Sequence, residues 1–435
     1  MIRVAHFSIL LLAVVAADSA FAQQPKRQDK SKPIKMLPIP DVNDMARVSS
    51  KKPLTRDLKR NSAFVLQTDE HAVSGTRYVV LTDHKEKPYL ESLSRLAAHY
   101  DGTVISVDDL ATLHDDGERF DRLRQQLLDQ KAKWVAIAPR KESFRENMLL
   151  GMWKLLSTLD DDHEIDVFPG ILLASNAKAF NKLIDQSIEH KPQPLKTLKP
   201  MAISQVNNTR ELRSLQKAAI LRKLFAEMEI DTPIVGIYSK RADGAPRLEG
   251  DKTWSLKTAG RKEFVKEFPD DVSEAINDSN LLVLHGHGIP GMSCSVDNAG
   301  LPSDLSGKMI FAGSCFSASP SKSDLPPMRQ APGGYEVKKR DAFIIQAIDN
   351  GAMMAFGHQR LSSGFPHLYP VLEDVLAGKS AGQAYQELLN GLFDIKPVKS
   401  EEMVIPLPAD GPQVRQNTYL YVLIGDPALQ PFLGK

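Results

Sequence analysis

Residues 281–288, LLVLHGHG, place the strongest constraint on the fold of this chain. Their first half, Leu281 to Leu284, is an uninterrupted apolar run of strand length, which is typical of a central parallel strand covered on both faces. A second run of this kind, Met309 to Ala312, follows after a segment long enough for one loop. The two runs therefore predict neighbouring strands at the centre of an α/β sheet.

Strand-like and helix-like segments alternate along the rest of the chain. In the N-terminal part the expected strands are 78–82, 103–107, 134–138 and 170–174, and the expected helices are 89–100, 120–130 and 177–189. In the C-terminal part the expected strands are 234–238, 281–284, 309–312, 352–356 and 419–424, and the expected helices are 208–229, 264–276, 341–349 and 381–392. This alternation predicts βαβ units, in which helices cover both faces of a parallel sheet.

Prolines mark a boundary between the two parts of this pattern. The stretch Lys191 to Pro200 contains three of them, which favours an irregular connection over a helix or a strand. We therefore expect two parallel-sheet α/β/α sandwich subdomains, an N-terminal α/β subdomain over residues 75–200 and a second subdomain over residues 201–435.

The first 74 residues lack this alternation and indicate export. Arg3 and His6 precede an apolar run that ends in Ala20-Phe21-Ala22, a pattern typical of a secretory signal peptide over residues 1–22. The run is shorter than the roughly 18 residues of a transmembrane helix, so no membrane anchor is expected after signal cleavage. Residues 23–74 are rich in Lys, Arg and Pro, which predicts a basic, disordered tail. The mature protein is therefore expected to be periplasmic or secreted.

Each of the two buried runs leads into a residue that can carry out chemistry. His287 follows the first strand, and Cys315 follows the second. In open parallel sheets ligands gather at the carboxyl ends of strands, so both side chains are expected at one rim. A thiolate beside an imidazole can attack a peptide carbonyl, and the imidazole can then protonate the departing amine. His287 and Cys315 are therefore the candidate catalytic pair.

Two backbone amides near this pair are candidates for an oxyanion hole. A tetrahedral intermediate carries a negative oxygen, which needs N–H donors aimed at it. Gly288 has no side chain that could block its N–H, and small residues precede Cys315. We therefore assign the oxyanion hole to the amides of Gly288 and Cys315. The loop after Cys315 does not identify a substrate-binding residue.

These surroundings resemble the gingipain-type cysteine peptidases of the caspase-like clan. The likeness rests on three short motifs: the strand and glycines of 282–288, the helix, Gly-Ala turn and strand of 343–357, and the closing Gly-Asp-Pro-x-Leu of 425–429. It implies that residues 201–435 form a caspase-like catalytic subdomain, preceded by the α/β subdomain of this family. It also implies that His287, within the Gly-His-Gly triplet, is the catalytic histidine and that the substrate is a peptide or protein.

Alternatives remain for each of these residues. His285 also precedes a glycine, so it is either a rival for the catalytic role or a hydrogen-bonded histidine of the core. A zinc site at His285 and His287 is disfavoured, because Cys294 is the only further Cys or His ligand near them in the sequence. Cys294 and Cys315 could form a permanent or reversible disulfide, which would consume the nucleophile. The chain could also be a catalytically silent or CHAT-type binding module, or another thiol hydrolase such as an amidase.

Composition disfavours some classes of partner. The formal net charge is only +1 at pH 7, because 55 Lys and Arg face 54 Asp and Glu. This balance does not favour nucleic acid or anionic lipid as a partner. No cofactor is expected, and a structural calcium ion is left open.

Overall fold

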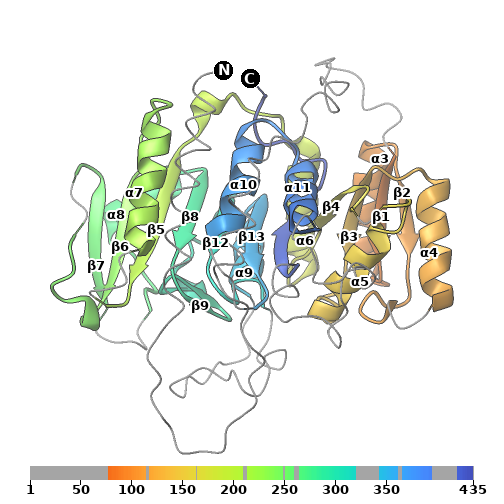
Figure 1. Ribbon diagram of the computed structural model, residues 1–435, viewed down its shortest axis with the longest axis horizontal. Coiled ribbons are helices and arrows are strands. Elements are labelled where there is room, and N and C mark those ends of the chain that lie inside the picture. Colours follow the sequence, from red (N-terminus) through yellow and green to blue (C-terminus); the bar gives the residue numbers. More distant parts are fainter. Residues whose placement is uncertain are drawn as a thin grey trace, which may run out of the picture. The chain divides into compact units, whose positions relative to one another are not determined.

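One large sheet with helices on both faces dominates the structure (Figure 1). The computed structural model describes residues 77–113, 117–162, 164–208, 213–247, 250–258, 264–319, 342–360, 365–393 and 419–434. The predicted signal peptide and basic tail, residues 1–22 and 23–74, lie outside this part of the chain. Because the sheet is mostly parallel and lies between helical layers, the predicted α/β sandwich class is confirmed.

Eleven strands form this sheet, in the order β2-β1-β3-β4-β14-β13-β12-β8-β5-β6-β7. The N-terminal strands are β1 (Tyr78–Thr82), β2 (Thr103–Ser106), β3 (Trp134–Ala138) and β4 (Phe168–Ile171). The later strands are β5 (Pro200–Val206), β6 (Ile234–Ser239), β7 (Thr253–Thr258), β8 (Leu281–His285), β12 (Met309–Gly313), β13 (Met354–His358) and β14 (Tyr421–Ile424). All residues of β8 are buried, as expected for a strand with both faces covered.

The two parallel sheets that the sequence predicted are the halves of this single sheet. β14 joins them, because it pairs in parallel with β4 and antiparallel with β13. The strands of the N-terminal half therefore run opposite to β13 and to the strands beyond it. The predicted subdomain boundary at residue 200 coincides with the first residue of β5, so the two parts are consecutive in sequence but share one sheet.

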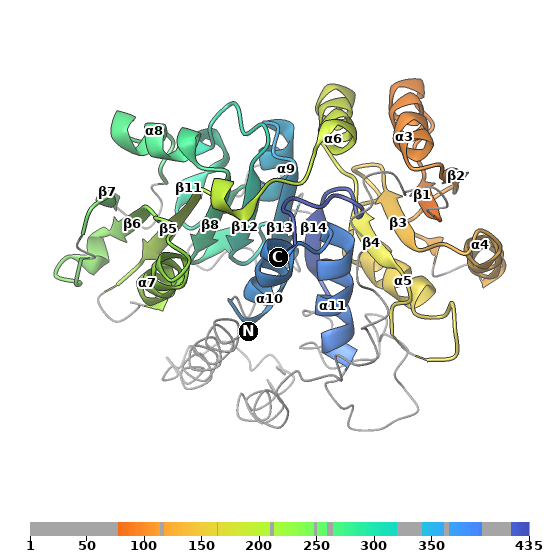
Figure 2. The same cartoon turned by 90° about the horizontal axis from the view of Figure 1, so that it is seen from above.

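Helices cover the sheet on both sides (Figure 2). One face carries α3 (Lys87–His99), α6 (Ala177–Glu189), α8 (Asp270–Asp278) and α9 (Phe343–Asp349). The other face carries α4 (Gly117–Asp129), α5 (Glu146–Leu156), α7 (Arg213–Ala226), α10 (Phe365–Leu376) and α11 (Ala381–Phe393). The described helices lack the length and apolar character needed to cross a membrane.

Among the strands of the large sheet and the helices that cover it, four elements were not predicted from the sequence: β5, β7, α5 and α10. β5 begins with a proline and carries Ser204 and Gln205 near its end, so it does not present an apolar run, although all seven of its residues are buried. α5 is buried along most of its length and therefore lacks the polar face that marks an amphipathic helix. β5 matters most, because it lies beside β8 and leads to the same edge of the sheet as β8.

Residues after β14 fasten the C-terminal end of the chain to the N-terminal half. The carboxylate of Asp426 is fully buried and accepts hydrogen bonds of 2.8 Å from the hydroxyls of Tyr78 and Tyr100. A side chain on Gly170 would lie 2.7 Å from the carbonyl oxygen of Gly425, so β4 and this segment are in direct backbone contact. The Gly-Asp-Pro motif therefore has a structural role at the junction of the two halves.

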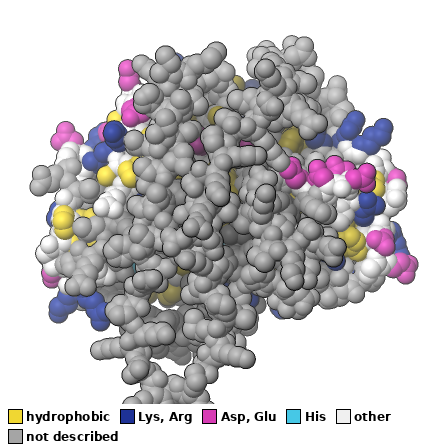
Figure 3. Space-filling view, in the orientation of Figure 1, with side chains coloured by type: hydrophobic (Ala, Val, Ile, Leu, Met, Phe, Trp, Pro, Cys, Tyr) yellow, Lys and Arg dark blue, Asp and Glu magenta, His cyan; other side chains and the backbone are white. Residues whose placement is uncertain are grey.

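The described surface is mixed in charge. Basic and acidic side chains both reach the described part of the face drawn in Figure 3. This agrees with the nearly balanced charge of the whole chain.

Candidate active site

His287 and Cys315 follow the ends of two neighbouring strands. β8 and β12 are parallel neighbours, and their register pairs Leu281 with Met309 and His285 with Gly313, a constant offset of 28 residues. His287 and Cys315 have the same offset, and each lies two residues beyond the last pair. The structure thus places both residues at one edge of the sheet, as the strand pattern predicted. His287 is exposed and Cys315 is partly exposed, so both are accessible to a substrate.

The chain turns sharply at Cys315. Phe316, the next residue, has a φ of +57°, in the left-handed region that non-glycine residues rarely adopt. Its amide donates to the carbonyl oxygen of Arg360 at 2.8 Å, and the Ser317 hydroxyl accepts from the amide of His358 at 3.0 Å. These bonds attach the turn to the end of β13. Backbone strain of this kind persists only where the surroundings enforce it, and it often occurs at functional sites.

His287 leads into a small ribbon of three strands: β9 (Gly288–Ile289), β10 (Met292–Ser293) and β11 (Val296–Asp297), which lies at the end of β8 (Figure 1). The amide of Cys294 donates to the carbonyl oxygen of His287 at 2.8 Å. On the other side, the amide of His287 donates to the Oε1 atom of Gln205 at 2.8 Å. The backbone of His287 is therefore held both by the ribbon and by β5.

The ribbon packs directly on the turn that carries Cys315. A Cβ atom added to Gly288 would lie 2.1 Å from the carbonyl oxygen of Cys315 and 2.6 Å from the hydroxyl of Ser314. Only glycine allows so close an approach. The buried hydroxyls of Ser293 and Ser314 also share a hydrogen bond of 2.8 Å. Backbone contact at the residue after His287 thus brings the end of β8 against the turn that carries Cys315.

The ribbon also fixes the direction of the Gly288 amide. Because the Cys294 amide donates to the His287 carbonyl oxygen, Gly288 and Ser293, which face each other in the next position, form a non-hydrogen-bonded pair. In such a pair the amides point away from the partner strand. The Gly288 amide therefore does not serve the ribbon, as an oxyanion donor requires. The assignment of the Gly288 and Cys315 amides to the oxyanion hole stays a prediction.

Cys294 differs from Cys315 in burial. Neither cysteine is part of a disulfide in the structure, so the disulfide alternative is not realised there. Cys294 is fully buried, and this burial raises the pKa of its thiol to about 12. A protonated, inaccessible thiol is a poor nucleophile. Cys315 is therefore the only one of the two with the exposure that a nucleophile needs.

His285 is a residue of the core. It is fully buried at the end of β8, and its ring stacks on that of Tyr369 with 6.2 Å between the centroids. Burial lowers the pKa of His285, so the ring is neutral. These features agree with the structural interpretation of His285 and leave His287 as the histidine that a substrate can reach.

Gln205 was missed in the sequence because β5 was missed. It is 7% exposed, and its Nε2 atom donates to the hydroxyl of Ser295 at 2.5 Å while its Oε1 atom accepts from His287. A polar residue near the end of a buried strand is the only sequence signal that could have identified it.

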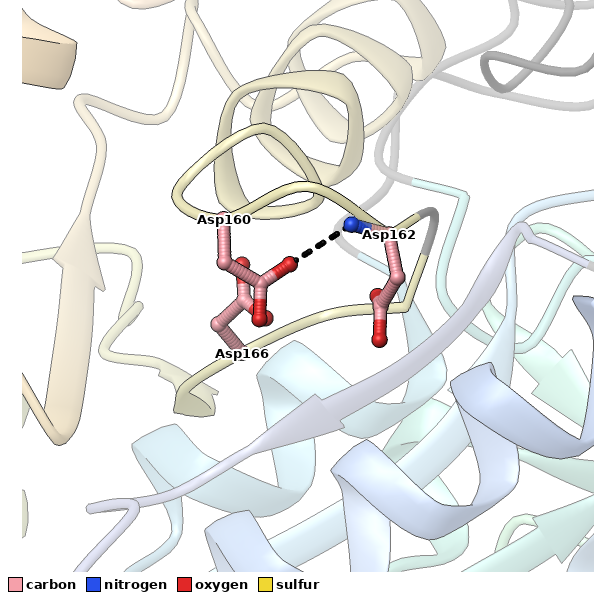
Figure 4. A group of neighbouring side chains, drawn as sticks. All are labelled: Asp160, Asp162 and Asp166. Atoms are coloured by element: carbon pink, nitrogen blue, oxygen red, sulfur yellow. Dashed lines mark hydrogen bonds between the residues drawn. The ribbon is translucent and has the colours of Figure 1, made fainter.

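Three carboxylates elsewhere in the described chain are close enough to hold a cation (Figure 4). They belong to Asp160, Asp162 and Asp166, in the loop between α5 and β4, and one oxygen of each lies within 4.8 Å of the others. Carboxylate oxygens suit hard cations such as calcium. Burial, followed by the bond to Asp160, raises the pKa of Asp166 to about 7. Among the described residues, neither His285 nor His287 belongs to a group with such geometry.

Comparison with known proteins adds no relative. A scan against protein-family models found no match, and searches of curated proteins and of solved structures found none either. The class of the protein is defined by its fold and its candidate site. It is a mostly parallel α/β sandwich in which an exposed histidine and a partly exposed cysteine follow the ends of two neighbouring strands.

Proposed function

We propose that this protein is an exported cysteine endopeptidase of the gingipain type, with His287 and Cys315 as its catalytic dyad. The observation that carries the proposal is the contact between the two strand ends, where a Cβ atom on Gly288 would meet the carbonyl oxygen of Cys315 at 2.1 Å. Cys315 itself forms one side of this backbone junction, and His287 immediately precedes Gly288 on the other side.

The proposed reaction proceeds through a thioester. His287 accepts the proton of the Cys315 thiol, and the thiolate attacks the carbonyl carbon of the scissile peptide bond. The amides of Gly288 and Cys315 stabilise the resulting oxyanion. His287 then gives its proton to the leaving amine, so the C–N bond breaks and the acyl group remains on Cys315. Water, deprotonated by His287, hydrolyses the thioester and restores the thiol.

Labelling with iodoacetamide under native conditions tests this proposal. We expect Cys315 to be alkylated and Cys294 to be spared, because Cys294 is buried and its pKa is about 12. Peptide mapping by mass spectrometry distinguishes the two sites. Cys315→Ala should abolish both native labelling and cleavage of a proteome-derived peptide set. His287→Ala should lower the cleavage rate by about 100-fold or more.

A matched control separates a catalytic effect from a general one. His99 is an exposed histidine on α3, so His99→Ala should leave labelling and cleavage unchanged. Full cleavage by Cys315→Ala would refute the enzyme assignment. Labelling of Cys315 without cleavage of any peptide would instead favour another thiol hydrolase, such as an amidase.

A further inference from the structure

We infer that Gln205 is a positioning residue for His287: its buried carboxamide holds the His287 backbone at the edge of the sheet where Cys315 lies. This inference rests on the proposed function, because it assigns a role relative to the dyad. Gln205 belongs to β5, which pairs with β8 on the side opposite to β12. The proposed dyad would thus depend on the three adjacent strands β12, β8 and β5. β5 would act on the dyad only through the residues that follow β8.

The contacts of Gln205 reach two separate points at the ribbon of β9, β10 and β11. Its Oε1 atom accepts from the amide of His287 at 2.8 Å, and its Nε2 atom donates to the hydroxyl of Ser295 at 2.5 Å. His287 precedes β9, whereas Ser295 lies between β10 and β11. One side chain therefore links both arms of the ribbon to the main sheet.

Gly286 makes this contact possible. A Cβ atom added at Gly286 would lie 2.7 Å from Cβ and 2.9 Å from Oε1 of Gln205. A residue with a side chain at 286 would therefore push the carboxamide away from the His287 amide. The two glycines of Gly-His-Gly therefore allow two different close contacts. Gly286 leaves room for the side chain of Gln205, and Gly288 leaves room for the turn that carries Cys315.

Positioning through the backbone matters because His287 is exposed. Because the ring extends from this backbone, the position of the His287 backbone limits where the imidazole can lie. A buried carboxamide is costly unless its polar atoms are bonded, and an apolar side chain would avoid this cost. Gln205 makes bonds with both polar atoms, and one of its two partners is His287 itself.

The rate at which iodoacetamide alkylates Cys315 in the full chain, measured across pH, tests the inference. Gln205→Met keeps the size of the side chain but loses both hydrogen bonds, so alkylation near neutral pH should slow by about tenfold or more. Gln205→Glu keeps an acceptor for the His287 amide and adds a carboxylate near the dyad. An ionised carboxylate there favours the protonated forms of both dyad members, so the alkylation profile should move to higher pH.

Ser204→Ala is the matched control. Ser204 precedes Gln205 in β5, is also buried and donates to the carbonyl oxygen of Ser214 at 3.0 Å, away from the ribbon. Its loss should leave the alkylation profile unchanged. If Ser204→Ala slows alkylation as much as Gln205→Met, the effect is a general loosening of β5 and the inference is wrong. If Gln205→Met does not fold, Gln205→Glu and Ser295→Ala decide the question by the same profile.

The controls also separate this inference from the proposed function. His287→Ala should slow alkylation and alter its pH profile if the dyad exists. If His287→Ala slows alkylation but both Gln205 variants match the wild-type profile, only the positioning role of Gln205 is refuted. When His287→Ala itself matches the wild-type profile, the dyad is refuted instead.

Discussion

Gly288 sets the distance between the ribbon of β9, β10 and β11 and the turn that carries Cys315. Its hydrogen faces the carbonyl oxygen of Cys315 and the hydroxyl of Ser314, where no other side chain would fit. At the scale of single residues, the proposed site therefore depends on an absent side chain as much as on the reactive ones. Catalytic geometry is sensitive to displacements of about 1 Å, which is the scale of the shift that one methyl group would force here.

Gly288→Ala should consequently lower activity while the fold persists. The added methyl group meets backbone rather than a flexible side chain, so the ribbon or the turn must move. We expect the rate of Cys315 alkylation and of peptide cleavage to fall by about 100-fold, with an unchanged circular dichroism spectrum. Gly117→Ala is the matched control, because a Cβ atom at that position has nothing within 4 Å. Equal activity of the two variants would contradict the tight contact.

At the scale of elements, the loop between α5 and β4 concentrates acidic side chains. Asp160 accepts a hydrogen bond from the amide of Asp162 at 2.9 Å, and Asp166 lies beside both (Figure 4). Burial and the neighbouring carboxylates disfavour ionisation of Asp166, which accounts for its raised pKa. The loop therefore carries an electrostatic penalty that grows with pH.

Asp166→Asn should raise the melting temperature at alkaline pH. The pKa of Asp166 is about 7 in the folded protein against 3.8 as its ordinary value. Between these values the unfolded chain has released its proton and the folded chain has not, so folding becomes less favourable as the pH rises. The penalty is complete above about pH 7 and absent below about pH 4. Thermal unfolding at several pH values should therefore show the largest gain at about pH 8 and a smaller gain at about pH 5.

Asp161→Asn is the control for this prediction, since Asp161 is a neighbour in sequence that is not part of the group of three carboxylates. It should change the melting temperature little at any pH. A gain for Asp166→Asn that is the same at acidic and alkaline pH would contradict the electrostatic origin of the penalty.

At the scale of the whole described sheet, β14 and the residues after it connect the two halves. Asp426 belongs to the C-terminal segment, whereas both of its hydroxyl donors come from the N-terminal half. Burial raises the pKa of Asp426, so the hydrogen bonds from Tyr78 and Tyr100 are needed to offset the cost of burying this carboxyl group. The stability of the sheet should thus depend on a residue near the end of the chain.

Asp426→Ala should therefore lower the free energy of unfolding by about 2–5 kcal/mol, because two buried hydroxyls lose this acceptor. Chemical denaturation measures the loss. Asp278→Ala is the comparison, since Asp278 is exposed and pairs with Lys199 at the surface, and it should change stability little. A loss for Asp426→Ala no larger than that for Asp278→Ala would show that the buried network does not hold the halves together.

The sequence by itself determined the central strands, the α/β class and the position of the candidate dyad. The apolar runs at 281–284 and 309–312 needed no knowledge of the rest of the chain, because a continuous apolar run is a local property that predicts a doubly covered strand. Since both runs lead to their reactive residue with the same spacing, the meeting of His287 and Cys315 at one edge followed from parallel pairing alone.

Only the tertiary structure decided which strands share a sheet and which buried polar groups meet. Parallel pairing of β14 with β4 merged two expected sheets into one, and no local pattern specifies a partner that lies some 250 residues away. The same holds for Gln205 and Cys294. The hydrogen-bond partner of Gln205 and the burial of Cys294 both depend on long-range packing. Apolar periodicity is set by neighbours along the chain, whereas polar partners are set by contacts across it.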